Sequence, residues 1–160
     1  NTYCISKFSA SSDTLCWSCK KHVGTLFHML FSCTFVLHFW EKVWFQINAI
    51  FKSHFAFDVI YIFCGSMADI WSQQPHVWGL LDILLSMGYQ QITSNWKNFT
   101  KISFKAWWYS VCYHHRLDTA FCAPISLFNK RNRIWSPLTD FLSDTNSIVV
   151  RNLRDDLRPP

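Results

Sequence analysis

Charged side chains are scarce in this 160-residue chain. Lysine, arginine, aspartate and glutamate together make up 16% of it, below the roughly 25% of an ordinary globular domain. Half of the residues are hydrophobic and 18% are aromatic, with nine Trp and fifteen Phe. A chain of this length can form one domain or two small ones. The aromatic excess predicts either a densely packed core or apolar surface that a partner covers.

The sequence also lacks the motifs of common catalytic sites. It contains no nucleophile elbow and no phosphate-binding loop. Its only adjacent acidic residues, Asp155 and Asp156, lie in a polar stretch near the end. They lack the strand and hairpin context in which two-metal chemistry is built. We therefore expect that the chain is not an enzyme.

Neither a secretion signal nor a membrane span is expected. Residues 1–12 are polar and contain no apolar h-region. Residues 23–40 carry no Lys, Arg, Asp or Glu, which is just long enough to suggest a membrane helix. His28, Cys33 and His38 lie inside this run, however, and polar groups are costly in lipid. A metal site followed by a buried helix explains the run better.

The cysteine count indicates a reducing compartment. There are seven cysteines, and an odd number without a secretion signal argues against a disulfide framework. We expect a nuclear or cytoplasmic protein. Four of the cysteines are isolated in the sequence and are expected in the core; they are Cys4, Cys64, Cys112 and Cys122.

A cluster near the start has the spacing of a metal site, Cys16-x2-Cys19-x8-His28-x4-Cys33. Zinc prefers four tetrahedral N and S ligands in structural sites, and three cysteines with one histidine are a standard set. Four protein ligands leave no open position, so the pattern predicts a structural zinc ion. Two alternatives stay open. The residues could be buried cysteines beside a core histidine, or His22 could replace His28.

Hydrophobic periodicity predicts a mainly α fold, with a small zinc-knuckle module followed by an irregular helical domain. The expected units are a leader (1–13), the module with its following helix (14–52), a helical domain (53–143) and a loose polar tail (144–160). Helices are predicted over residues 35–51, 75–96, 104–120 and 127–134, and a further one starts at Ser136-Pro137. Residues 55–64 read as a short strand or a buried extended link.

Three single residues bear on these helices. Pro75 fits the first turn of its helix, and Ser103 fits the N-cap of the next. Gly88 is expected to weaken the helix that contains it.

Positive charge gathers in the second half of the chain. Residues 96–133 hold seven basic side chains against Asp118 alone. A basic stretch interleaved with Trp and Tyr suits RNA or single-stranded DNA, because phosphates meet cations and bases stack on rings. A solvated helix face is the competing interpretation. The candidate contacts, including those beside the cysteines, are Trp17, Lys20, Lys21, Lys97, Lys101, Lys105, Lys130, Arg131 and Arg133.

Several of these segments together look like a known family. Cys16-Trp17-Ser18-Cys19, the run from Gly24 to Cys33 and the run from Phe39 to Trp44 resemble the C-terminal zinc-binding segment of the reverse-transcriptase polyprotein of LINE-type (non-LTR) retrotransposons. The resemblance continues through the segments 92–97, 104–107 and 134–138. It thus covers roughly residues 14–142. Its most specific part is the Gly-Thr-x2-His-x4-Cys core.

The resemblance implies zinc ligands at Cys16, Cys19, His28 and Cys33, and a non-catalytic fragment that binds RNA or single-stranded DNA beside the remainder of a reverse-transcriptase polyprotein. The alternative is a structural remnant that packed on the polymerase and has no activity of its own. The chain departs from the family in placing two residues, where the family often has three, between its first two cysteines. The stretch after Cys112 is also unusually rich in His and Cys.

Overall fold

The structure is a computed structural model, and it describes residues 14–54, 57, 75–95, 102–120 and 125–144. Within these residues the elements are one π-helical turn and four α-helices: η1 (His28–Ser32), α2 (Thr34–Phe51), α5 (Pro75–Ser94), α6 (Phe104–Ala120) and α7 (Ile125–Asp144). The mainly α class is confirmed. None of the described helices is both long and apolar enough to cross a membrane.

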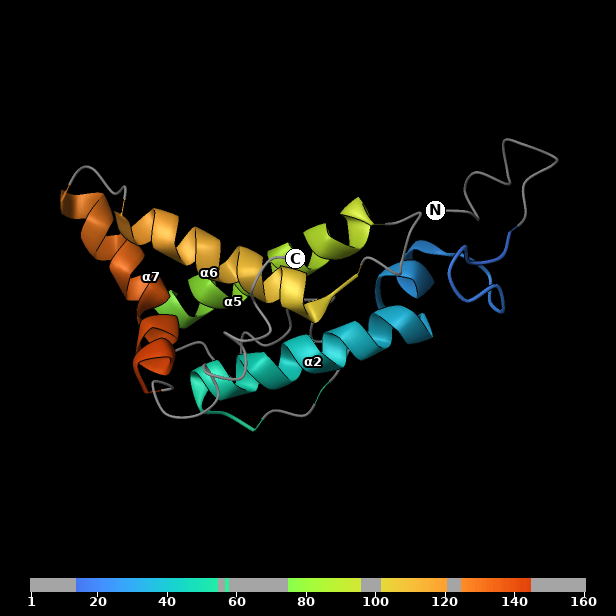
Figure 1. Ribbon diagram of the computed structural model, residues 1–160, viewed down its shortest axis with the longest axis horizontal. Coiled ribbons are helices and arrows are strands. Elements are labelled where there is room, and N and C mark those ends of the chain that lie inside the picture. The colour runs from blue at the N-terminus through green and yellow to red at the C-terminus, as the bar shows by residue number, and fades with distance from the viewer. Residues whose placement is uncertain (1–13, 55–56, 58–74, 96–101, 121–124, 145–160) are drawn as a thin grey trace, which may run out of the picture.

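The molecule is elongated, with the cysteine-bearing segment at one end and α7 at the other (Figure 1). We call residues 14–33 the Cys/His module. α2 leads away from this module along one side, and α5 and α6 lie along the other side (Figure 1). One hydrophobic core runs from Cys16 and Met29 in the module to Trp135 and Leu138 in α7. Packing therefore continues across the domain boundary expected after residue 52.

The long helices lie where the apolar periodicity predicts them. α2 begins one residue before the expected start, α5 ends two residues before the expected end, and α6 has the expected bounds. Ser103 precedes α6, and its Oγ accepts the Ala106 N–H at 3.4 Å, so the predicted N-cap is confirmed. α5 begins at Pro75, where the missing N–H of proline costs nothing.

The last helix corrects the sequence analysis. A short helix over residues 127–134 and another starting at Ser136-Pro137 were expected, but α7 runs without interruption from Ile125 to Asp144 with Pro137 inside it. Proline cannot donate to the carbonyl four residues earlier, which here belongs to Arg133. Ser136 Oγ donates to that carbonyl at 2.9 Å instead. The hydroxyl replaces the missing backbone donor and allows the helix to continue.

Three fully buried tryptophans hold the helices together. Trp40, Trp107 and Trp135 come from α2, α6 and α7. Each indole N–H donates to another element: to Leu30 O at 2.8 Å, Leu84 O at 3.1 Å and Asp118 Oδ2 at 3.1 Å, respectively. A buried indole that keeps a hydrogen bond gives its full apolar area to the core at little desolvation cost.

Some expectations fall on other parts of the chain. The leader (1–13), the tail beyond Asp144 and the possible strand over residues 55–64, apart from Phe57, lie outside the described residues. The same is true of Lys97, Lys101 and the side chain of Lys130. Cys4, Cys64 and Cys122 also lie outside them, whereas Cys112 is a half-buried free cysteine.

Candidate metal centre

A tight loop presents the first two cysteines. Leu15 and Val23 form an antiparallel bridge, and the Cys16 N–H donates to His22 O at 2.7 Å. The Lys20 N–H returns to Cys16 O at 3.0 Å, which folds the intervening residues into one turn. Lys20 makes this turn in a left-handed conformation, with φ of 55°. Both sulfurs therefore face the same side of the loop.

The π-helical turn η1 presents the other two ligands. In an ordinary α-helix, side chains five residues apart point about 140° away from each other. Between His28 and Cys33 the backbone instead makes a wider turn, closed by the Cys33 N–H donating to His28 O at 2.8 Å. Thr25 precedes the turn, and its Oγ1 accepts the His28 N–H at 3.1 Å. The wider turn brings His28 and Cys33 to the same side.

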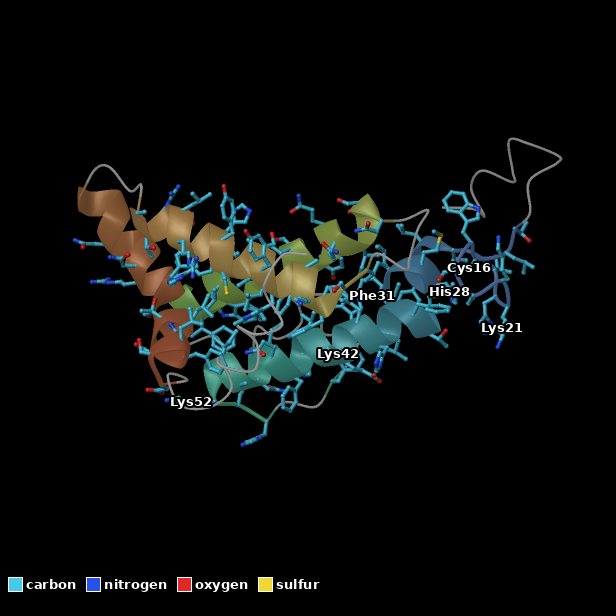
Figure 2. All side chains as sticks on the ribbon, in the orientation of Figure 1. Cys16, Lys21, His28, Phe31, Lys42 and Lys52 are labelled. Carbon is cyan, nitrogen blue, oxygen red and sulfur yellow. The ribbon has the colours of Figure 1, made fainter. Side chains whose placement is uncertain are left out.

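The four side chains come together in one cluster, and Figure 2 shows two of them, Cys16 and His28, close together at one end of the molecule. One ligand atom from each of Cys16, Cys19, His28 and Cys33 lies within 4.8 Å of all the others. A tetrahedral zinc ion with Zn–S of about 2.3 Å and Zn–N of about 2.0 Å separates its ligands by about 3.8 Å for S···S and about 3.5 Å for S···N. The Cys16 and Cys33 sulfurs are 3.9 Å apart, and Cys19 Sγ lies 3.3 Å from His28 Nε2. These distances fit a tetrahedral metal ion.

Backbone amides and crowding act on the thiols in opposite directions. Burial raises the pKa of the Cys19 thiol, but the N–H groups of Lys21 and His22 point at its sulfur, and the pKa ends below its ordinary value. Burial raises the pKa of Cys33 to about 11, and the neighbouring Cys16 and Cys19 add to this rise. Three thiolates crowded together repel one another, and a divalent cation between them removes that repulsion.

His28 is set up as a neutral ligand. Burial lowers the pKa of its imidazole, and the nearby His22 lowers it further. Ser32 Oγ lies 3.3 Å from Nδ1. When the Nδ1 proton is donated to this hydroxyl, the lone pair of Nε2 faces Cys19, which is the tautomer that a metal requires.

His22 was the open alternative to His28. Its ring lies 5.3 Å from the ring of His28, centroid to centroid, and the side chain is exposed. Within the described residues the group that can hold a metal ion contains His28 and not His22. The predicted set of four is therefore the one that the fold brings together.

Those predicted nucleic-acid contacts that the structure describes do not form one cluster. Lys20 and Lys21 are exposed on the Cys/His module, Lys105 is exposed at the start of α6, and Arg131 and Arg133 are exposed on α7, at the opposite end of the molecule. Trp17 is half-buried and packs against the core.

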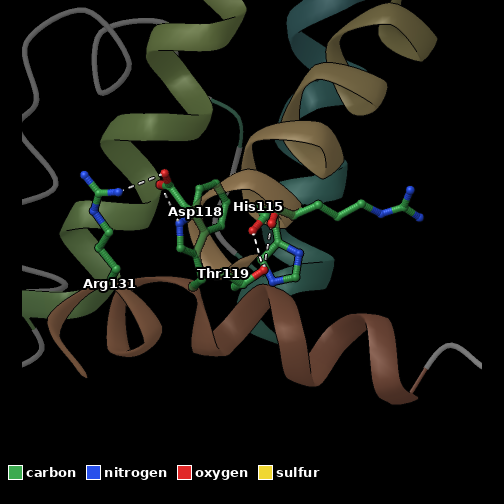
Figure 3. A network of polar contacts seen from close by, with 6 residues as sticks. His115, Asp118, Thr119 and Arg131 are labelled. Atoms are coloured by element: carbon green, nitrogen blue, oxygen red, sulfur yellow. Dashed lines mark hydrogen bonds and ion pairs between the residues drawn. The ribbon is translucent and has the colours of Figure 1, made fainter. Parts of the chain in front are cut away.

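One of these cations already has a protein partner. Arg131 Nη1 lies 3.2 Å from Asp118 Oδ1, while the other oxygen of Asp118 accepts the Trp135 indole (Figure 3). A phosphate would compete with this carboxylate for the guanidinium. Among the described basic residues, Lys20, Lys21 and Lys105 are therefore better placed for phosphate contact than Arg131.

Three exposed aromatic rings were not predicted from the sequence as candidate contacts. Tyr109 and Tyr113 on α6 are 62% and 51% exposed, and Phe45 on α2 is 76% exposed. The signal was present, because in a helix with buried Trp107, Trp108 and Val111 the positions 109 and 113 fall on the opposite face.

Comparisons of the chain with protein-family models, with curated proteins and with solved structures found no match. The likeness to the reverse-transcriptase segment therefore stays a hypothesis that rests on the residues quoted for it. Three of those residues, Ile92, Trp107 and Trp135, are buried in the core. They bear on how the chain folds rather than on what it binds.

Proposed function

We propose that Cys16, Cys19, His28 and Cys33 bind one structural zinc ion. The observation that carries this proposal is the convergence of three sulfurs and one imidazole nitrogen at tetrahedral ligand distances. Soft thiolates with one imidazole in a tetrahedron favour zinc over magnesium or calcium, which take oxygen ligands. When bound, zinc supplies a cross-link between the loop and η1. Four protein ligands leave it no position for a substrate, so we propose no catalytic activity.

Metal content per chain tests the zinc proposal. We expect about one zinc per chain after purification without added zinc, and its loss in Cys19→Ser. Cys112→Ser is the matched control, because Cys112 is a half-buried free cysteine on α6, outside the cluster. The proposal is contradicted if Cys19→Ser retains the zinc, or if the wild type contains none even after refolding with zinc.

We further propose that the chain binds RNA or single-stranded DNA without sequence-specific chemistry of its own. Its net charge is +5, and exposed lysines lie on the Cys/His module and at the start of α6. Binding that depends on phosphate contacts must weaken steeply with salt. We expect the affinity for a single-stranded RNA oligomer to fall about 10-fold or more between 50 and 200 mM salt. No detectable binding at 50 mM salt would exclude this function.

From the resemblance we propose that such a module works beside the remainder of a LINE-type reverse-transcriptase polyprotein, in the nucleus or cytoplasm. The alternative is a structural remnant that packed on the polymerase. Exposed apolar side chains favour this alternative, among them Leu26, Phe27, Phe35 and Phe45. It predicts aggregation of the isolated chain, rescue by a polymerase fragment and no RNA binding. A soluble monomer that binds RNA would count against it.

A further inference from the structure

Four exposed residues form a line on the outer face of α6: Lys105, Tyr109, Tyr113 and Arg116. They are spaced by four, four and three residues, so they share one face of the helix. We call them the α6 stripe. The opposite face of the helix carries the buried Trp107, Trp108 and Val111, which pack into the bundle. The stripe therefore faces outward and has a cation at each end.

Packing does not account for the two tyrosines. Tyr109 is 62% exposed and Tyr113 51% exposed, and Tyr113 makes an edge contact only with the neighbouring His114 at a centroid distance of 5.9 Å among the described residues. Tyrosine is also a poorer helix former than Lys, Glu or Ala. Neither the core nor helix propensity thus gives a reason for two aromatic rings one turn apart in solvent.

The charges around the stripe favour a polyanion. The only acid in α6 is Asp118, whose two carboxylate oxygens are engaged by Arg131 and by the Trp135 indole. The exposed Phe45 on α2 has a mixed setting, because both Glu41 and Lys42 lie about one helical turn before it. A carboxylate there opposes the attraction of the lysine for phosphate, whereas the α6 stripe has a cation at each end and no acid between them.

We infer that the α6 stripe is a stacking surface for single-stranded nucleic acid, with Tyr109 and Tyr113 receiving successive bases and Lys105 and Arg116 meeting phosphates. This inference rests on the proposed nucleic-acid function and assigns its site. The two tyrosines are about 6 Å apart along the helix axis, so they can take neighbouring bases of an unstacked strand. Stacking on rings is tolerant of sequence, since every base has a π face.

Fluorescence anisotropy with a labelled single-stranded RNA, and in parallel with single-stranded DNA of the same sequence, tests this assignment in the full zinc-loaded chain. We expect Tyr109→Ala and Tyr113→Ala each to weaken binding about fivefold or more. Tyr109→Phe keeps the ring and should bind as the wild type does. Lys105→Gln should lower the slope of log affinity against log salt by about 0.7.

Two controls separate the possible failures. Phe45→Ala removes a more exposed ring from α2 and should leave the affinity unchanged. Thermal unfolding checks that each variant folds. A wild type that binds neither strand overturns both the function and this site. A wild type that binds equally well without Tyr109 and Tyr113, or loses as much affinity in Phe45→Ala, overturns the site alone. Loss of affinity in the tyrosine variants alone supports it, and the two strands show whether RNA or DNA is preferred.

Discussion

Trp40 of α2 lies directly against the bare backbone of Gly88 in α5. A Cβ atom added to Gly88 would come within 2.6 Å of the Trp40 ring, far inside normal contact. The ring is fully buried, and it packs edge-on against Tyr89 at a centroid distance of 5.2 Å. Gly88 thus allows α2 and α5 to approach each other closely. Glycine disfavours a helix, and the packing of Trp40 offsets this loss of helix propensity.

We predict that Gly88→Ala destabilises the protein by about 1–3 kcal/mol, because a rigid indole ring cannot move aside in a packed core. Gly79→Ala is the matched control in the same helix. Its Cβ would meet Ile134 Cγ1 at 3.2 Å, a milder approach than that at Gly88, so the gain of about 1 kcal/mol in helix propensity should roughly cancel the crowding. Chemical denaturation of the two variants measures the difference. Equal stabilities of the two variants would show that the Trp40 ring does not resist a Cβ atom at position 88.

Ser32→Ala should weaken zinc binding about tenfold. Ser32 Oγ is the partner of His28 Nδ1 at 3.3 Å, and partners of this kind orient the ligand and fix its tautomer. Competition with a chromophoric chelator measures the affinity. Ser86→Ala removes another exposed serine, whose hydroxyl bonds to Ile83 O within α5, and should leave the zinc affinity unchanged. An unchanged affinity in Ser32→Ala would mean that His28 is oriented by its packing alone.

Lys20→Gly should stabilise the zinc-bound protein by about 1 kcal/mol. Lys20 has a left-handed φ of 55°, a conformation that costs a residue with a Cβ about 1–2 kcal/mol and glycine almost nothing. Lys21→Gly is the control, since Lys21 is equally exposed but has no positive φ. In Lys21→Gly the added flexibility of the unfolded chain should destabilise the protein by about 0.5–1 kcal/mol. We expect the melting temperature to rise in Lys20→Gly and to fall in Lys21→Gly.

His115 should make the protein less stable in acid. Burial lowers the pKa of its imidazole, and Arg116 lowers it further against the opposing effect of Asp118. The unfolded chain then binds a proton at His115 more readily than the folded one. The contribution of the neutral imidazole to the free energy of unfolding is therefore complete above pH of about 6.5 and is lost as the pH falls below it. Gln in its place can keep the 3.0 Å contact with Thr139 but cannot take up a proton.

The stability of His115→Gln, measured by denaturation between pH 7.5 and 5, should therefore fall less than that of the wild type. Loss of zinc in acid affects both proteins alike and cancels in the comparison. His114→Gln changes the exposed neighbouring histidine and should follow the wild type. A wild-type curve that coincides with that of His115→Gln would contradict the prediction.

The helices were predictable where apolar periodicity and a terminal signal coincide. Both bounds of α6 were predicted, the first from the Ser103 cap and the second from the spacing of the apolar residues. Both signals are local properties of the sequence. α7 was not predictable in the same way. Pro137 is a strong local signal for a break, but Ser136 supplies a donor to the Arg133 carbonyl, and Trp135 and Leu138 on either side of the proline are anchored in the core. Tertiary packing there outweighs the local preference.

The cluster of four was predictable because metal coordination restricts both residue type and spacing. His28 was predicted over His22 because its four-residue gap to Cys33 matches compact zinc knuckles, and it is His28 that lies in the cluster. What the sequence did not predict is the π-helical turn that brings His28 and Cys33 to the same side, with Met29 and Phe31 buried between them. The exposed face of α6 was hardest to predict, because the exposure of Tyr109 and Tyr113 becomes evident only when the buried face of the helix is known.

The hydrogen bond from the Trp40 indole to the Leu30 carbonyl gives the protein an internal optical reporter. Leu30 stands between the ligands His28 and Cys33 in η1, and its carbonyl receives the indole proton at 2.8 Å. Trp107 and Trp135 are tethered to α5 and α6 instead. Loosening of the ligand-bearing segment would change the surroundings of Trp40 and of Trp17, which lies between Cys16 and Cys19. Intrinsic emission would therefore follow release of the proposed metal ion in real time without a dye.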